Sequence, residues 1–285
     1  MPAFFIKNNF YLLKICYKLC INILLRIIMK KITLLFTTIF LIGACSQNEQ
    51  EADSPAEVEK PSEPLVEYVW HTAGPDFDEE GINLAKLIND WNSMIDDMSC
   101  SGMTGANILT PKVSNEGYDF IWVMLWDSQE GRDECWDDWT ENQQLNWDYL
   151  IEGIMQYDLD NVYLFKPTVG KNPNMENTSG SFVNTFYFCT YKEGYSEDDL
   201  IAYQKDLNAI EGFSDYWWYV TLEPMFEQDE PKPDFVWLDL WGSNEDKASD
   251  QAIFANTDLP AQVDEKFSCM PNIDGVSFDG VAIRR

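Results

Sequence analysis

The chain has 285 residues and is strongly acidic, with 49 Asp and Glu against 19 Lys and Arg and a formal net charge of −30 at pH 7. The first 45 residues hold six of the basic residues and none of the acidic ones, so the remainder has 13 basic and 49 acidic residues and a net charge of −36. Such a surface repels phosphate backbones and anionic headgroups, which argues against nucleic-acid binding and against electrostatic attachment to a membrane.

Residues 1–45 are expected to form an export leader. Two lysines follow Met29, then come an apolar run over residues 32–42 and the small residues Gly43 and Ala44, as in a secretory signal. A transmembrane helix over residues 10–28 is the alternative, but basic residues interrupt it, and each costs about 2.5–3.5 kcal/mol at the centre of a membrane. These residues are Lys14, Lys18 and Arg26. We therefore expect Met29 to be the true first residue and the preceding 28 residues to come from a misassigned start.

The end of this leader, Ile42-Gly43-Ala44-Cys45, resembles the lipobox of bacterial lipoproteins. The resemblance implies that Cys45 is acylated and anchors an exported protein at the bacterial cell envelope, on the periplasmic face of the outer membrane. Residues 46–63 are rich in Glu, Gln, Ser and Pro and show no periodicity, so we expect a disordered acidic tether between the lipid and the folded part.

The remainder contains an internal repeat with a constant spacing of 115 residues in its clearest part. Six residues recur there: Asp119, Phe120, Trp122, Leu125, Trp126 and Ser128 return as Asp234, Phe235, Trp237, Leu240, Trp241 and Ser243. Weaker matches extend the repeat in both directions. Towards the N-terminus, Trp70 and His71 correspond to Phe188 and Cys189.

Hydrophobic periodicity predicts the same order of elements in each copy. The first copy reads as a strand at 65–72, a helix at 78–98, strands at 103–110 and 119–126, a helical region at 129–151 and a strand at 161–165. The second reads as a strand at 182–190, a helix at 196–210, strands at 216–222 and 234–241, a helical region at 244–267 broken by Pro260, and a strand at 276–283. This order is the ferredoxin-like βαββαβ motif.

Two such units in one chain resemble the dimeric α+β barrel superfamily, which includes the antibiotic-biosynthesis-monooxygenase-like and stress-responsive barrel domains. The resemblance implies an α+β fold in which two tandem ferredoxin-like repeats form an intramolecular barrel, a pseudo-dimer whose two sheets face one another. The first repeat is expected at residues 64–166 and the second at 182–285, joined by a linker at 167–181.

The strand at 119–126 is apolar on both faces, so we expect it to be buried on both sides. Its aliphatic face suits the helices, which leaves the aromatic face to meet the other sheet. A pocket for a flat apolar ligand is then predicted among five side chains: Trp122, Met124, Trp126, Trp237 and Trp241. Asp239 takes the place of Met124 in the second copy, and a carboxylate there needs water, a partner or a ligand. The alternative is that these aromatic side chains simply fill a core.

His71 is the only histidine, which excludes any metal site that needs two of them. With Glu67 four residues earlier on the same strand face, His71 is a candidate general base oriented by a carboxylate. The alternative is a histidine at the end of a strand that bonds to the backbone or to water, and Cys189 in the equivalent position of the second copy favours this alternative.

Four cysteines follow Cys45, at positions 100, 135, 189 and 269, and an even number in an oxidising compartment permits two disulfides. Cys100 lies at the end of one predicted helix and Cys135 at the start of another that runs alongside it. If those ends are a helix length apart, the pair exceeds the ~7 Å limit on Cα separation. The same objection applies to Cys189 and Cys269, so we expect buried free thiols.

These observations favour an exported, lipid-anchored protein that binds a small hydrophobic or aromatic ligand, or acts as an interaction module, without turnover and without a cofactor. Its only contact with a membrane would be the lipid anchor. The resemblance implies an alternative, a cofactor-independent monooxygenase or isomerase with His71 as the base and Asp239 or Glu67 as its partner. In a third interpretation the aromatic rows are fully packed and the function is confined to surface contacts.

Overall fold

The computed structural model describes residues 63–78, 81–228, 232–270 and 275–285, so Cys45 and the predicted leader lie outside the described residues. The first half of the described chain contains β1 (Leu65–Ala73), α2 (Ile82–Asp96), β2 (Met103–Pro111), β3 (Phe120–Trp126), α3 (Gln129–Asn142), α4 (Gln144–Leu150) and β4 (Met155–Lys171). The second half contains β5 (Ser181–Tyr191), α5 (Glu197–Asn208), β6 (Trp218–Pro224), β7 (Phe235–Trp241), α6 (Asn244–Ala255), α7 (Leu259–Lys266), β8 (Phe267–Met270) and β9 (Val276–Arg284). No helix in these ranges is long and apolar enough to cross a membrane.

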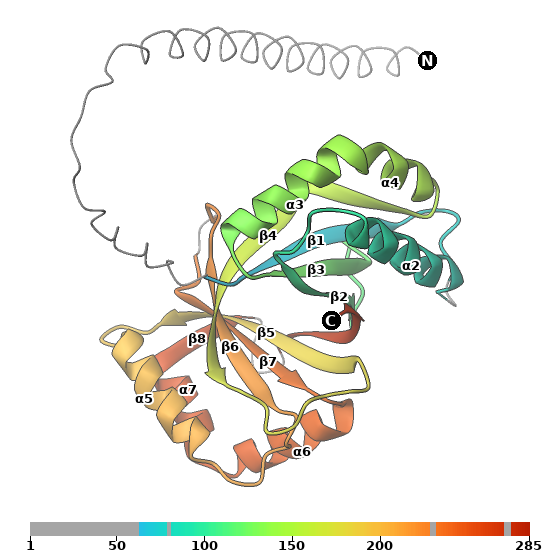
Figure 1. Ribbon diagram of the computed structural model, residues 1–285. Coiled ribbons are helices and arrows are strands. Elements are labelled where there is room, and N and C mark those ends of the chain that lie inside the picture. The colour runs from blue at the N-terminus through green and yellow to red at the C-terminus, as the bar shows by residue number, and fades with distance from the viewer. Residues whose placement is uncertain (1–62, 79–80, 229–231, 271–274) are drawn as a thin grey trace, which may run out of the picture. The chain divides into compact units, whose positions relative to one another are not determined.

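The strands form one closed antiparallel barrel. Eight of them pair in the order β7-β6-β4-β1-β3-β2-β9-β5, and pairing of β5 with β7 closes the ring. The short β8 pairs with residues 188–191 of β5, beyond the stretch 181–186 that pairs with β9. In Figure 1, α2, α3 and α4 cover the strands of the first half, and α5, α6 and α7 lie outside those of the second.

The prediction of two tandem ferredoxin-like repeats is therefore wrong, because the two halves share one continuous barrel. Two strands join them. The 17-residue β4 pairs with β1 as far as Phe165 and continues along β6 from Phe165 to Lys171, while β9 pairs with both β2 and β5. Separate sheets would leave rows of unpaired backbone groups at their edges, and closure pairs those groups. The predicted strand at 161–165 is consequently much longer, and β4 takes up the first five residues of the predicted linker at 167–181.

Three hydrophobic cores stabilise this arrangement. One draws buried aliphatic and aromatic residues from all eight barrel strands and none from a helix, so it is the barrel interior. The second packs the outer face of β1, β2 and β3 against α2, α3 and α4, and the third packs β5, β6 and β7 against α5 and α7.

The aromatic and aliphatic faces of β3 and β7 point in the directions opposite to those predicted. Ile121 and Val123 lie in the barrel interior, whereas Trp122, Met124 and Trp126 lie under the helices. In the second half Trp237 and Trp241 likewise belong to the core beneath the helices. Aromatic side chains from other strands, among them Tyr68, Phe165 and Phe186, already occupy the barrel interior. The aliphatic faces of β3 and β7 complete that core, and their indoles fill the space beneath the helices.

Both halves begin their second helix, α3 or α6, in the same way. Ser128 caps α3 by accepting a hydrogen bond from the backbone N of Gly131 at 3.1 Å, and Ser243 caps α6 by accepting one from Asp246 at 3.1 Å. The repeat at a spacing of 115 thus reproduces a local folding signal.

The expectation of free thiols is also wrong, because Cys100 is bonded to Cys135 and Cys189 to Cys269. β1 and β3 are antiparallel, so α2 and α3, which follow them in the chain, are antiparallel too. The end of α2 therefore lies beside the start of α3. Cys100 and Cys135 have a Cα separation of 4.5 Å. Cys269 lies on β8, a strand the sequence did not predict, directly opposite Cys189 on β5.

Candidate functional site

His71, the proposed base, lies near the end of β1 in the core beneath the helices. Its side chain is 5% exposed, stacks on Phe120 and contacts the ring of Trp122. Its Nδ1 lies 2.9 Å from the carbonyl oxygen of Val69, which can only accept, so Nδ1 carries the proton in this hydrogen bond. Burial lowers the pKa of His71 from 6.5 to about 4, so the ring is neutral at pH 7.

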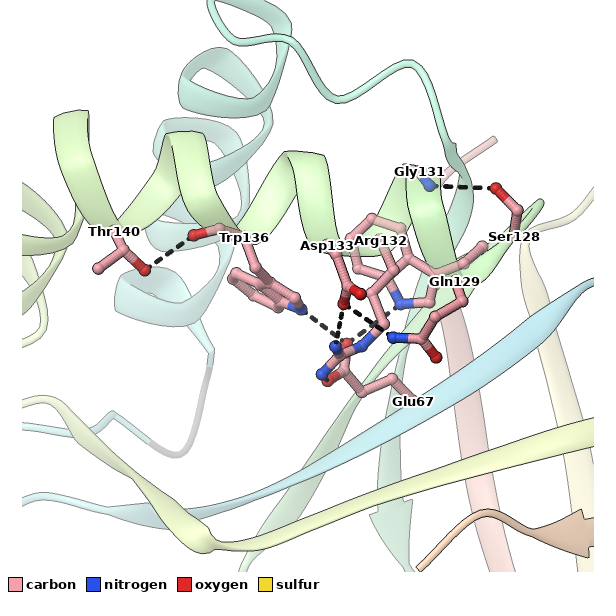
Figure 2. Close-up of polar contacts among 9 residues, drawn as sticks. Glu67, Ser128, Gln129, Gly131, Arg132, Asp133, Trp136 and Thr140 are labelled. Atoms are coloured by element: carbon pink, nitrogen blue, oxygen red, sulfur yellow. Dashed lines mark hydrogen bonds and ion pairs between the residues drawn. The ribbon is translucent and has the colours of Figure 1, made fainter. Parts of the chain in front are cut away.

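Glu67, the proposed partner of His71, is instead bound to the helix above it. Figure 2 shows Arg132 and Trp136 of α3 reaching its carboxylate. Arg132 forms an ion pair with Oε1, and the indole nitrogens of Trp126 and Trp136 donate to Oε2 at 3.1 and 2.9 Å. Glu67 is 1% exposed, and three donors satisfy a charge that would otherwise be very unfavourable to bury.

Asp239 occupies the corresponding region of the second half. It lies on the helix side of β7 and is partly exposed, and the indole nitrogen of Trp217 donates to its Oδ1 at 3.1 Å. Burial raises the pKa of Asp239 from 3.8 to about 6, although hydrogen bonds from Trp237 and Trp217 and the positive charge of Lys247 oppose the rise.

The structure does not bring the three proposed catalytic residues together. In the described part of the chain, the hydrogen bonds of His71, Glu67 and Asp239 all go to other groups. His71 contacts Phe120 and Trp122, and Glu67 contacts Trp126, whereas Asp239 lies on β7 in the other half of the barrel. Among the described residues, the carboxylates of Glu67 and Asp239 accept hydrogen bonds from indole nitrogens, and the Nδ1 of His71 bonds to a backbone carbonyl.

The predicted ligand-binding residues are packed core residues. Trp122, Met124, Trp126, Trp237 and Trp241 are between 1% and 7% exposed. Trp122 contacts Trp91 of α2 and Trp147 of α4, and Trp126 contacts Trp136 of α3. The indole nitrogen of Trp122 has no hydrogen-bond partner among the described residues.

The barrel interior is also filled by side chains. Its buried members include Tyr68, Phe165, Phe186 and Phe278. Asn184 on β5 is a polar exception: it is 2% exposed, shares a strand face with Phe186, and its Oδ1 has no partner in the described ranges.

Two hollows lie on the outside of the fold. A hollow of about 350 Å³ between α2 and α4 is lined mainly by polar side chains such as Lys86 and Asp90. A second, of about 460 Å³, lies where β9 begins and is lined by Lys112, Lys247 and Ser277 among others. The described residues contain no group of three or more His, Cys, Asp or Glu placed to hold a metal ion.

Two basic residues were not predicted from the sequence, Arg132 beside Glu67 and Lys247 in the second hollow. Arg132 and Lys247 are 115 residues apart, the spacing of the internal repeat, and each lies in the first turns of a helix that follows a Trp-rich strand. A search of the repeat for recurring charges, rather than recurring aromatic residues, would have found the pair.

No protein-family model matches the chain, and no curated protein matches it in sequence. Solved structures do match. A protein from Fusobacterium nucleatum subsp. nucleatum, named provisionally as a monooxygenase, has a TM-score of 0.50 at 11% identity, and the match covers 78% of this chain and 93% of that one. Chlorite dismutase from Candidatus Nitrospira defluvii in complex with imidazole matches with a TM-score of 0.48 at 9% identity, over 79% of this chain and 93% of that one.

The chain has the dimeric α+β barrel fold. The Fusobacterium protein shares this fold, and in the present chain one polypeptide supplies all eight barrel strands. At 11% identity the likeness establishes the fold of the barrel and leaves its activity open.

Proposed function

We propose that this barrel is an exported, lipid-anchored module that acts through its outer surface and does not turn over a substrate. One observation carries the proposal: the three cores occupy both the barrel interior and the spaces beneath the helices, where the ligand pocket and the catalytic residues were predicted. The hollows described above lie on the outer surface.

Two disulfides support export. Disulfides persist in oxidising compartments and are rare in a reducing cytosol, so both the Cys100–Cys135 and Cys189–Cys269 bonds fit the periplasm or cell surface. They agree with the lipobox at Cys45, which lies outside the described residues. The lipid would tether the barrel to the periplasmic face of the outer membrane.

Anchoring is tested by expressing the full chain and a Cys45→Ala variant in bacteria supplied with a labelled fatty acid. The wild-type protein is expected to carry label and to sediment with outer-membrane fragments. The variant is expected to carry none. Equal labelling of the two proteins, or wild-type protein recovered without lipid in the cytosol, would exclude the anchor.

Absence of turnover is tested by incubating the purified full chain with cell extract and following its small molecules by mass spectrometry. We expect no compound to be consumed relative to a heat-denatured control. A compound consumed catalytically by the wild-type protein would refute the proposal.

A cofactor-independent monooxygenase is the second candidate, favoured by the fold shared with the Fusobacterium protein. In that case His71 would be the base, with Glu67 or Asp239 as its partner. Consumption of a compound that stops in His71→Asn but continues in the matched core variant Phe120→Leu would establish it. Activity that survives His71→Asn would remove His71 from the mechanism.

A further inference from the structure

The hollow of about 460 Å³ is built by both halves of the chain. Lys112 and Val113 come from the segment that follows β2, Lys247 and Gln251 from α6, and Val276 and Ser277 from the start of β9. The backbone N of Lys112 donates to the carbonyl oxygen of Ser277 at 2.9 Å and fixes the two segments together. The hollow therefore exists only when the barrel is closed.

Lys247 is held in position by two hydroxyl groups. Its Nζ donates to Oγ1 of Thr185 and to Oγ of Ser277, each at 2.8 Å, and the two hydroxyl oxygens are 2.9 Å apart. Thr185 is fully buried. Ordering a lysine side chain costs up to ~2 kcal/mol of conformational entropy. Folding already orders Lys247, so most of this cost does not fall on ligand binding. The hydroxyl groups position the ammonium, whose charge also acts on Asp239 and whose Nζ lies 5.5 Å from the centroid of the Trp241 ring.

Lys112 supplies a second ammonium group. Its Nζ forms an ion pair with Oδ1 of Asp279 at 2.5 Å, and the two side chains are 27% and 58% exposed. Exposed ion pairs of this kind contribute at most ~1 kcal/mol. A ligand anion can therefore compete with Asp279 for Lys112.

Two lysines around one hollow are notable in a chain with 49 acidic residues and only 19 basic ones. Gln251 lies one helical turn after Lys247 and adds an amide donor on the same side of α6. The valine side chains, of which Val113 is 81% exposed, give the rim an apolar part.

We propose that this hollow binds a small organic anion, a carboxylate or phosphate group joined to a short apolar chain. The inference rests on the proposed function, since it names the ligand that the outer surface would take. Lys247 and Lys112 would hold the anionic oxygens, Gln251 and Ser277 would complete their hydrogen bonds, and Val113 and Val276 would contact the apolar chain.

The test is calorimetric titration of the full chain in detergent with hexanoate, hexyl phosphate and inorganic phosphate, with hexylammonium as the cationic control. We expect saturable binding of at least one hexyl anion and none of hexylammonium. Preference between hexanoate and hexyl phosphate identifies the head group, and weaker binding of inorganic phosphate measures the apolar contribution. Raising the salt concentration is expected to weaken the binding.

Four variants locate the site. Lys247→Met and Lys112→Met are each expected to weaken binding about tenfold. Asp279→Asn removes the internal competitor of Lys112 and is expected to strengthen binding about threefold. Lys86→Met, which removes a lysine paired with Asp90 in the other hollow, is expected to change nothing. Lys112 and Asp279 are surface residues, so their variants remain informative if Lys247→Met does not fold.

Absence of saturable anion binding, or equal binding by wild-type, Lys112→Met and Asp279→Asn proteins, would overturn the site. Binding that Lys86→Met alone abolishes would also overturn it, by moving the ligand to the other hollow. Conversion of a bound anion to a product would instead refute the proposed function and leave the anion site standing, so the two failures are distinguishable.

Discussion

At the scale of single residues, each half of the barrel places a carboxylate on the helix side of a strand, close to a cation on its second helix, α3 or α6. In the first half Glu67 on β1 pairs with Arg132, and in the second Asp239 on β7 lies in the field of Lys247. The strand register places Glu67 opposite Met124 and Thr185 opposite Asp239. The acid has therefore moved to the neighbouring strand while the cation has kept its place in the repeat.

Replacing Glu67 by Gln is expected to destabilise the protein by about 3 kcal/mol, because it removes the buried partner of Arg132 and leaves that guanidinium only its ion pair with the exposed Asp133. Urea unfolding measures the change. The double variant Glu67→Gln/Arg132→Met, which removes both charges, should lose less than the sum of the two single variants. Strict additivity would show that the two side chains do not interact.

Asn184 gives a direct test of whether the barrel is filled. Its unpartnered Oδ1 carries the penalty of a buried, unsatisfied acceptor, about 1–3 kcal/mol. Asn184→Leu, which is close in volume, is therefore expected to raise the free energy of unfolding by about 1–2 kcal/mol. A large loss of stability would mean that Asn184 binds water or a ligand inside the barrel, contrary to the proposed function.

At the scale of elements, the two halves use different bonds at the same place. Cys135 of α3 ties that helix to Cys100, which follows α2. Asp250, 115 residues after Cys135, accepts a hydrogen bond from the backbone N of Ser214 at 2.8 Å, in the segment that follows α5. A covalent tie in one half thus corresponds to a hydrogen bond in the other.

The double variant Cys100→Ser/Cys135→Ser is expected to unfold with a free energy about 2–4 kcal/mol lower than the wild type, since the bond closes a loop with a sequence separation of 35. Thiol titration of the unreduced, denatured wild-type protein should detect no free thiol at the four positions after Cys45. Detection of free thiols there would restore the original expectation from the sequence.

The sequence specifies the order of these elements but not how they close. Alternation in strands and helical periodicity predicted almost every element, and the 115-residue repeat predicted that both halves fold alike. Residues 120–126 are apolar on both faces, so hydrophobicity alone did not reveal which face meets the helices. Closure depends on backbone pairing of β4 with β6 and of β2 with β9, which leaves no signature in the side chains. The anion hollow was missed for the same reason, since its lysines meet only through that closure.

At the scale of the whole molecule, His71 and Asp239 affect the pH dependence of stability in opposite directions. Burial lowers the pKa of His71 from 6.5 to about 4, so between these values the unfolded chain binds more protons and stability rises with pH. Burial raises the pKa of Asp239 from 3.8 to about 6, so the folded chain binds more protons in that interval and stability falls as pH rises. Each pKa change of one corresponds to about 1.4 kcal/mol, which makes both effects roughly 3 kcal/mol at most.

Because the two effects oppose each other, removing either group should shift the pH dependence in the direction set by the other. His71→Phe, which keeps a ring against Phe120, is expected to lose stability relative to its own acidic value as the pH rises from about 4 to about 6. Asp239→Asn, which keeps an acceptor for Trp217, is expected to gain stability over the same interval. Both slopes are measured against the wild type by urea unfolding at a series of pH values, so the many exposed carboxylates cancel in the comparison. Parallel curves for all three proteins would mean that neither group is buried as the barrel places it. That result would contradict the packed cores on which the absence of an internal site depends.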